Sequence, residues 1–152
     1  MIRTLWIVLV ISVCLIGAYV TNAHDSDPIE PQKPTLVINL ISGAEDLHAA
    51  VMGLHFAEHG LADGREVVVF FNVKAPPLAR KELADTVKFK EMPSVRAIIA
   101  DLQKQGAQMV VCPMCAEITG VEAAELAPGI DMIEDRKQIF DHMHGNSVVF
   151  TY

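Results

Sequence analysis

Cysteine is scarce in this chain, which has only three in 152 residues. Cys14 lies in an apolar N-terminal segment, so Cys112 and Cys115 are the only two cysteines in the rest of the chain. A single domain of this length buries most of its apolar surface without disulfide staples. Both residues lie in the stretch QMVVCPMCAEITG. The pair therefore has four alternative roles: a structural staple, a metal clip, a redox pair or a carrier of sulfur.

Runs of basic residues are also missing. The chain has 12 Lys and Arg against 19 Asp and Glu, which gives a formal net charge of −7. Proteins that bind nucleic acid neutralise its phosphates with clustered Lys and Arg. The acidic balance therefore argues against a nucleic-acid partner.

The N-terminus has the three parts of an export signal. Arg3 gives a positive start, Leu5–Val20 is an uncharged apolar stretch, and Thr21–Ala23 offers small residues for cleavage. The apolar stretch is 16 residues long, whereas a membrane span needs about 20. Residues 1–23 are therefore predicted to be a cleaved signal peptide, with an uncleaved membrane anchor as the alternative. We expect an exported, periplasmic protein, in a compartment that oxidises thiols unless something reduces them.

The remaining chain has the size of one domain. Cleavage after Ala23 leaves 129 residues (152 − 23). Residues 24–34 are polar and rich in proline, and they are predicted to be a disordered lead-in. The folded domain is expected over residues 35–152.

Apolar runs alternate in this domain with segments of helical period. The predicted strands are Thr35–Ser42, Glu66–Lys74, Ala107–Val111 and Ser147–Tyr152. The predicted helices are residues 46–60, 94–106 and 131–143, together with a short helix over 78–90 and one over 116–126 that is broken at Gly120. Strands separated by helices indicate βαβ units, and therefore an α/β fold with a mainly parallel sheet and helices on both faces.

Both cysteines follow directly from the third predicted strand. Pro113 suits the first turn of a helix, where its missing N–H costs nothing. The partial positive charge at a helix N-terminus stabilises a thiolate, which predicts Cys112 as the nucleophile. Cys115, one turn further on, is then the resolving thiol that closes a disulfide.

Ligands of open α/β sheets bind outside the carboxyl ends of the strands. The other strand ends place small and polar residues at the edge where the cysteines are expected. The predicted pocket residues are Ser42, Gly43, Asn72, Lys74 and Met114. Of these, Lys74 is expected to stabilise the thiolate.

The cysteine pair could also have a purely structural role, either as an inert disulfide or as two small core residues. A disulfide that closes so short a loop adds little stability, and a position at a strand end disfavours a purely core role. Thioredoxin-like proteins also place a CxxC motif before a helix, but after their first core strand. Here the motif follows the third strand, so a thioredoxin fold is not expected, while thiol chemistry is.

The pattern resembles the DsrE/DsrF family. The resemblance consists of a buried first strand ending in small residues, a helix, a second strand, and the strand-end Cys112 followed eight residues later by Gly120. It covers residues 35–152 and implies a flavodoxin-like three-layer fold and homo-oligomers such as trimers or hexamers. The best-understood members carry sulfur as a persulfide on the strand-end cysteine, within sulfur-oxidation or tRNA-thiolation relays.

By position, Cys112 matches that cysteine, and Cys115 matches a second cysteine of some members. Thr119 stands where the family usually has a basic residue, and relay members are usually cytoplasmic. Both departures argue against a tRNA-type relay, but neither argues against a role of Cys112 as a sulfur carrier. The resulting hypothesis is sulfur transfer through Cys112, with a donor or acceptor protein or a small thiol as partner and no cofactor.

A metal-binding module is the rival hypothesis, because thiolate and thioether ligands select Cu(I). Its predicted copper ligands are Cys112, Cys115, Met114, His142 and His144. A further stripe of His48, Met52, His55 and His59 follows one helical face, where solvated or interface residues are the plainer interpretation. An oligomeric scaffold without chemistry is the third alternative.

Overall fold

Five parallel strands form one sheet in the order β4-β3-β2-β1-β5. The structure, a computed structural model, describes residues 33–135 and 137–152. The strands are β1 (Thr35–Leu40), β2 (Glu66–Phe71), β3 (Gln108–Val111), β4 (Ile130–Met132) and β5 (Val148–Thr151). The helices are α2 (Leu47–Ala62), α3 (Val95–Lys104), α4 (Pro113–Thr119) and α5 (Gln138–Asp141), with the 3-10 turns η1 (Ala44–Asp46), η2 (Pro76–Ala79) and η3 (Ala123–Glu125). The predicted α/β fold with a parallel sheet is confirmed.

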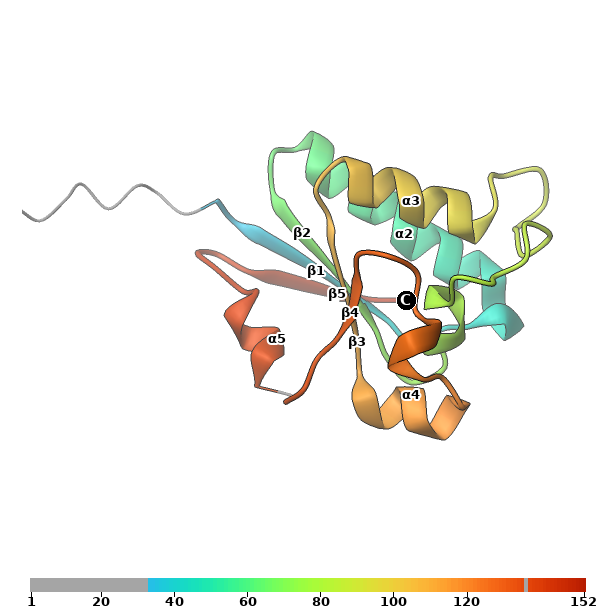
Figure 1. Cartoon of the computed structure of the whole chain (residues 1–152). Coiled ribbons are helices and arrows are strands. Elements are labelled where there is room, and N and C mark those ends of the chain that lie inside the picture. The colour runs from blue at the N-terminus through green and yellow to red at the C-terminus, as the bar shows by residue number, and fades with distance from the viewer. Residues whose placement is uncertain (1–32, 136) are drawn as a thin grey trace, which may run out of the picture. The chain divides into compact units, whose positions relative to one another are not determined.

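The sheet lies between two unequal layers of helices (Figure 1). The helices α2 and α3 cover one face, α5 lies on the other, and α4 follows the carboxyl end of β3. Both long helices begin at a side-chain cap. The Asp46 carboxylate accepts a hydrogen bond from the Ala49 N–H at 3.0 Å, and the Ser94 hydroxyl accepts one from the Ala97 N–H at 3.3 Å.

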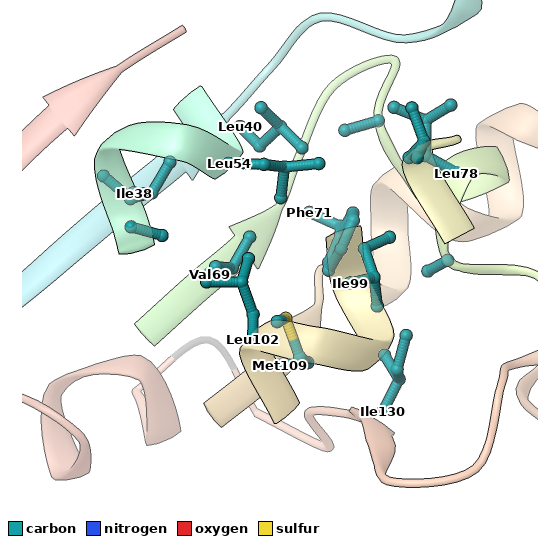
Figure 2. Packing of buried hydrophobic residues seen from close by; sticks show 14 of the residues in the cluster. Ile38, Leu40, Leu54, Val69, Phe71, Leu78, Ile99, Leu102, Met109 and Ile130 are labelled. Carbon is teal, nitrogen blue, oxygen red and sulfur yellow. The ribbon is translucent and has the colours of Figure 1, made fainter. Parts of the chain in front are cut away.

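The main core fills the space between the sheet and these two helices. Alternate residues of the central strands point toward it, since successive side chains of a strand face opposite sides. Figure 2 shows part of this cluster, in which Ile38, Leu40, Leu54, Val69, Phe71, Leu78, Ile99, Leu102, Met109 and Ile130 are labelled. Most of the apolar surface that the described domain buries therefore lies on the α2 and α3 side.

The opposite face has a much smaller cluster. Its buried members are Val37, Val68, Val110 and Ile133, with Phe70, Ile139 and Met143 packed against them at partial burial. The helix on this side, α5, has only four residues. This face of the sheet is thus covered thinly, and its covering helix also borders the site described below.

The last predicted helix, residues 131–143, was wrong over its first part. Residues 130–132 instead form the edge strand β4, paired in parallel with β3 through Met109 and Ile130. The strand buries Ile130 and exposes Asp131, so pairing with β3 overrides the local helical period. The short helix expected over residues 78–90 is reduced to the 3-10 turn η2, followed by further turns without a helix.

The predicted signal peptide and almost all of the predicted lead-in lie outside the described residues. Within residues 33–135 and 137–152, no helix is long and apolar enough to cross a membrane.

Replacing Leu54 by Ala tests the main core. Leu54 is fully buried on α2, and the cavity left by a buried Leu→Ala change costs about 2–5 kcal/mol of unfolding free energy. Urea denaturation followed by circular dichroism measures the loss. Leu61→Ala, the same change at a partly buried position of the same helix, should cost clearly less. Equal losses for the two variants would contradict this packing.

Candidate functional site

The cysteines occupy the turn where β3 ends and α4 begins. The Cys112 backbone N–H still donates to the Phe71 carbonyl of the neighbouring strand at 3.0 Å, as the last bond of the ladder. Cys112 then precedes the first helical residue, Pro113, whose fixed φ suits that position. Gly120 ends the helix in the left-handed conformation at φ 68°, which glycine adopts without strain. The predicted strand-to-helix turn at Cys112 is confirmed.

Residues of a distant loop hold α4 in place. The Arg80 guanidinium donates to the Gly120 carbonyl at the end of the helix, where a cation also compensates the helix dipole. The Lys81 ammonium donates to the Ala124 carbonyl at 3.1 Å. Inside the helix, the Thr119 hydroxyl donates to the Cys115 carbonyl at 2.7 Å. The cysteine-bearing segment is therefore fixed at both ends.

The two cysteines differ in environment, and neither is part of a disulfide. Cys112 is 9% exposed, while Cys115 is half-buried and its thiol donates to the Asn72 side-chain oxygen at 3.0 Å. Burial raises the pKa of Cys115, the neighbouring Cys112 raises it further, and the Val73 N–H opposes the shift. Burial and the neighbouring thiol therefore favour the protonated form of Cys115.

A chain of hydrogen bonds continues from Cys115 across the carboxyl ends of the strands. The Asn72 amide donates to the Asn39 side-chain oxygen at 3.1 Å, and the Asn39 amide donates to the Thr151 hydroxyl at 3.2 Å. The Asn72 oxygen also accepts from the Val73 N–H at 2.9 Å. These contacts fix which end of the Asn72 amide faces Cys115, and they connect α4 to β2, β1 and β5.

Both cysteines open into a cavity of about 730 Å³. This volume is within the range of small-molecule sites. Its lining residues are Phe70, Asn72, Cys112, Pro113, Met114, Cys115, Glu134, Asp135, Ile139 and Phe140. A second cavity of about 520 Å³, beside α2 and β5, contains neither cysteine among its described lining residues. The first cavity is thus the candidate site, because it joins a concave volume to both free thiols.

Two of the five predicted pocket residues, Asn72 and Met114, line this cavity with the cysteines. The other three are not among its described lining residues. Lys74 is exposed to solvent, and its ammonium pairs with the Glu45 carboxylate at 3.4 Å. The Ser42 N–H donates to the Tyr152 carbonyl at 3.1 Å, and Gly43 packs against the Lys74 carbonyl. These three residues surround the ends of β1 and β5 instead.

Half of the cavity wall was not foreseen from the sequence. The sequence predicts Phe70 to lie in a strand. Because its neighbour Phe71 faces the main core, Phe70 must face the opposite side of the sheet. The other residues, Glu134, Asp135, Ile139 and Phe140, follow β4 or belong to α5. Recognition of β4 as a strand would have placed this segment at the same edge as Cys112.

The predicted copper ligands fall into separate places. Cys112, Met114 and Cys115 share the cavity, whereas His142 borders another cavity beside β4. The His144 N–H donates to the Thr35 hydroxyl at 2.9 Å, at the amino end of β1. Among residues 33–135 and 137–152, no three His, Cys, Asp or Glu side chains form a group able to hold a metal ion.

The predicted His and Met stripe lies on α2. The His48 ring stacks on Phe89 with centroids 4.6 Å apart. His55 Nδ1 lies 2.6 Å from the Glu58 carboxylate. These contacts agree with residues of a packed helix flank.

Comparisons with known proteins agree with this architecture. The chain is similar to MTH1491, a protein of unknown function from Methanobacterium thermoautotrophicum, at 12% identity and a TM-score of 0.55, over 78% of this chain and 99% of that one. It is also similar to the ychN protein from E. coli, at 12% identity and a TM-score of 0.54, over 80% and 100% of the two chains. At such identity the likeness shows the fold alone. No curated protein matches the chain.

A family model identifies the family, which these structures do not. It matches residues 35–142, from the start of β1 to the end of α5, and thus includes both cysteines and most of the cavity wall. The chain belongs to the DsrE/DsrF-like family.

Proposed function

We propose that this protein carries sulfur as a persulfide on Cys112, with Cys115 as its partner thiol. The observation that carries the proposal is the unequal state of two thiols in one cavity. Cys112 precedes a helix and opens into the cavity, while Cys115 donates to Asn72 and has a raised pKa. Sulfur transfer needs a nucleophilic thiolate, and a neighbouring thiol that stays protonated does not attack the persulfide.

The loading step is a sulfur transfer without net oxidation. The Cys112 thiolate attacks the terminal sulfur of an organic persulfide R–S–SH and forms Cys112–S–SH. The S–S bond of the donor breaks, and its electron pair leaves with R–S⁻, which takes a proton from solvent. An acceptor thiolate reverses this step by attacking the outer sulfur and releasing the Cys112 thiolate.

Cys115 provides a second outcome. Once deprotonated, its thiolate attacks the inner sulfur of Cys112–S–SH, which forms the Cys112–Cys115 disulfide and releases HS⁻. An external thiol must then reduce the disulfide. Because the pKa of Cys115 is raised, this reaction is suppressed at neutral pH, so the persulfide persists long enough to be transferred.

Export and self-association complete the proposal. The N-terminal pattern over residues 1–23 supports a periplasmic location, where an exported carrier needs a reducing partner. Self-association is supported by the edge strand β5, where Val148, Val149 and Phe150 are 41%, 50% and 42% exposed. An exposed apolar edge strand is a surface that proteins usually cover.

Cu(I) binding is the second candidate. The sulfur atoms of Cys112, Met114 and Cys115 come from one helical turn and line one cavity, and soft ligands of this kind suit Cu(I).

Mass spectrometry after polysulfide treatment distinguishes the two candidates. We expect an adduct with the mass of one sulfur atom on the peptide that holds Cys112. The adduct should disappear in Cys112→Ala and remain in Cys115→Ser, because only Cys112 is the carrier. Tight binding of one Cu(I) that needs both cysteines, without any sulfur adduct, would overturn the carrier proposal.

The lifetime of the persulfide should depend on pH through Cys115. It should be long at neutral pH and shorten as the pH rises toward the raised pKa of Cys115, since only the thiolate attacks Cys112–S–SH. Release of sulfide, measured over a pH series, follows the reaction. In Cys115→Ser, the dependence should vanish.

Asn72→Ala should move this pH dependence to lower pH. The Asn72 oxygen accepts from the neutral thiol of Cys115, and a hydrogen bond to the neutral form disfavours ionisation. Asn146→Ala, the same change at an exposed position before β5, serves as the control and should leave the profile unchanged. An unshifted profile in Asn72→Ala would show that Asn72 does not hold the proton of Cys115.

Sedimentation velocity tests the proposed self-association. The wild-type protein should sediment as a multiple of the protomer mass, and Val149→Lys should shift it toward the monomer by placing a charge on the exposed edge. Ala62→Lys, at an exposed position on α2, is the matched control. A monomeric wild-type protein would refute self-association.

A further inference from the structure

Large apolar side chains from three elements line the cavity together with the cysteines. Phe70 comes from β2, Met114 from α4, and Ile139 and Phe140 from α5. Met114 is 54% exposed and Phe140 is 67% exposed, so both present their apolar surface at the cavity mouth. The volume of about 730 Å³ far exceeds what sulfide or another inorganic sulfur species fills.

The charged groups of the wall are carboxylates. Glu134 and Asp135 are the two charged side chains among the described lining residues. Their loop is held by Gln138, whose side-chain oxygen accepts from the Glu134 N–H at 2.7 Å and from the Asp135 N–H at 3.3 Å. Both residues are exposed members of the lining, so their carboxylates lie at the cavity mouth, where they repel anions and attract cations.

We infer that Cys112 exchanges sulfur with a small organic persulfide or disulfide that is uncharged or cationic and has an apolar body. Burial of that body against Phe70, Ile139 and Phe140 supplies the binding energy, since apolar surface gains about 25 cal/mol per Å² removed from water. The carboxylates at the mouth disfavour anionic donors such as thiosulfate and glutathione persulfide. This inference rests on the proposed function and specifies the partner of its reactive thiol.

Two aromatic disulfide reagents test the selectivity directly. In each case the Cys112 thiolate attacks one sulfur of R–S–S–R, forms Cys112–S–S–R and releases R–S⁻, which absorbs light. The uncharged reagent is 4,4′-dithiodipyridine, and the dianionic one is 5,5′-dithiobis(2-nitrobenzoate). The reacting protein carries Cys14→Ser and Cys115→Ser, so that Cys112 is its single thiol.

The measured quantity is the second-order rate constant in the native state, divided by that of the same protein unfolded in denaturant. We expect this ratio to be at least tenfold higher for the uncharged reagent than for the dianionic one. The double change Glu134→Gln/Asp135→Asn should raise the rate with the dianionic reagent severalfold. It should leave the rate with the uncharged reagent unchanged. The double change Glu82→Gln/Glu91→Gln, at two exposed positions outside the cavity, removes the same charge and should change neither rate.

Phe140→Ala tests the apolar wall separately. This side chain is largely exposed, so its truncation leaves the fold intact, and it should slow the uncharged reagent severalfold. Equal native-to-unfolded ratios for both reagents, or no effect of the two cavity variants, would overturn the inferred selectivity while the sulfur adduct on Cys112 still supports the carrier. Absence of that adduct would overturn the carrier function instead, whatever the reagent preference.

Discussion

The parallel pairing of β2 with β3 is the constraint on which the site depends. The register aligns Phe71 with Val111, and the Cys112 N–H closes the ladder on the Phe71 carbonyl at 3.0 Å. The next residue of each strand, Asn72 and Cys112, therefore leaves the sheet at the same level. A slip of one residue would turn the side chains to the opposite faces and separate the thiols from their amide partner.

The two faces of the sheet differ in what they contribute to stability and to the site. The face toward α2 and α3 contains most of the buried apolar residues, so it supplies most of the stability. The other face has a small cluster and a four-residue helix, and the cavity lies on this side. Segments with few buried contacts open at low free-energy cost. The wall formed by α5 is thus the part of the site that opens most easily, while Cys112 and Asn72 stay anchored to the central strands.

Much of this arrangement follows from short-range rules. The apolar runs predict β1, β2, β3 and β5, and the Cys112–Pro113 step predicts the turn from strand to helix. The same rules failed where tertiary pairing decides. The strand β4 has only three residues, too few for a periodic pattern. Without it the prediction missed the four lining residues that follow it, Glu134, Asp135, Ile139 and Phe140.

The position of Lys74 away from the cavity has a local cause. Its position just after β2 indicated a site residue, but Val73 adopts a φ of 50°, which turns the chain. The Lys74 ammonium then meets the Glu45 carboxylate rather than the cysteines. Conversely, the contact between Asn72 and Cys115 joins residues 43 positions apart, and only the assembled sheet brings them together.

The chain of side chains from Cys115 through Asn72 and Asn39 to Thr151 has one further consequence. Amides and hydroxyls give and accept hydrogen bonds, but they do not ionise as carboxylates or imidazoles do. This chain therefore holds the Cys115 thiol through neutral groups alone, and it orients the thiol without placing a charge beside it.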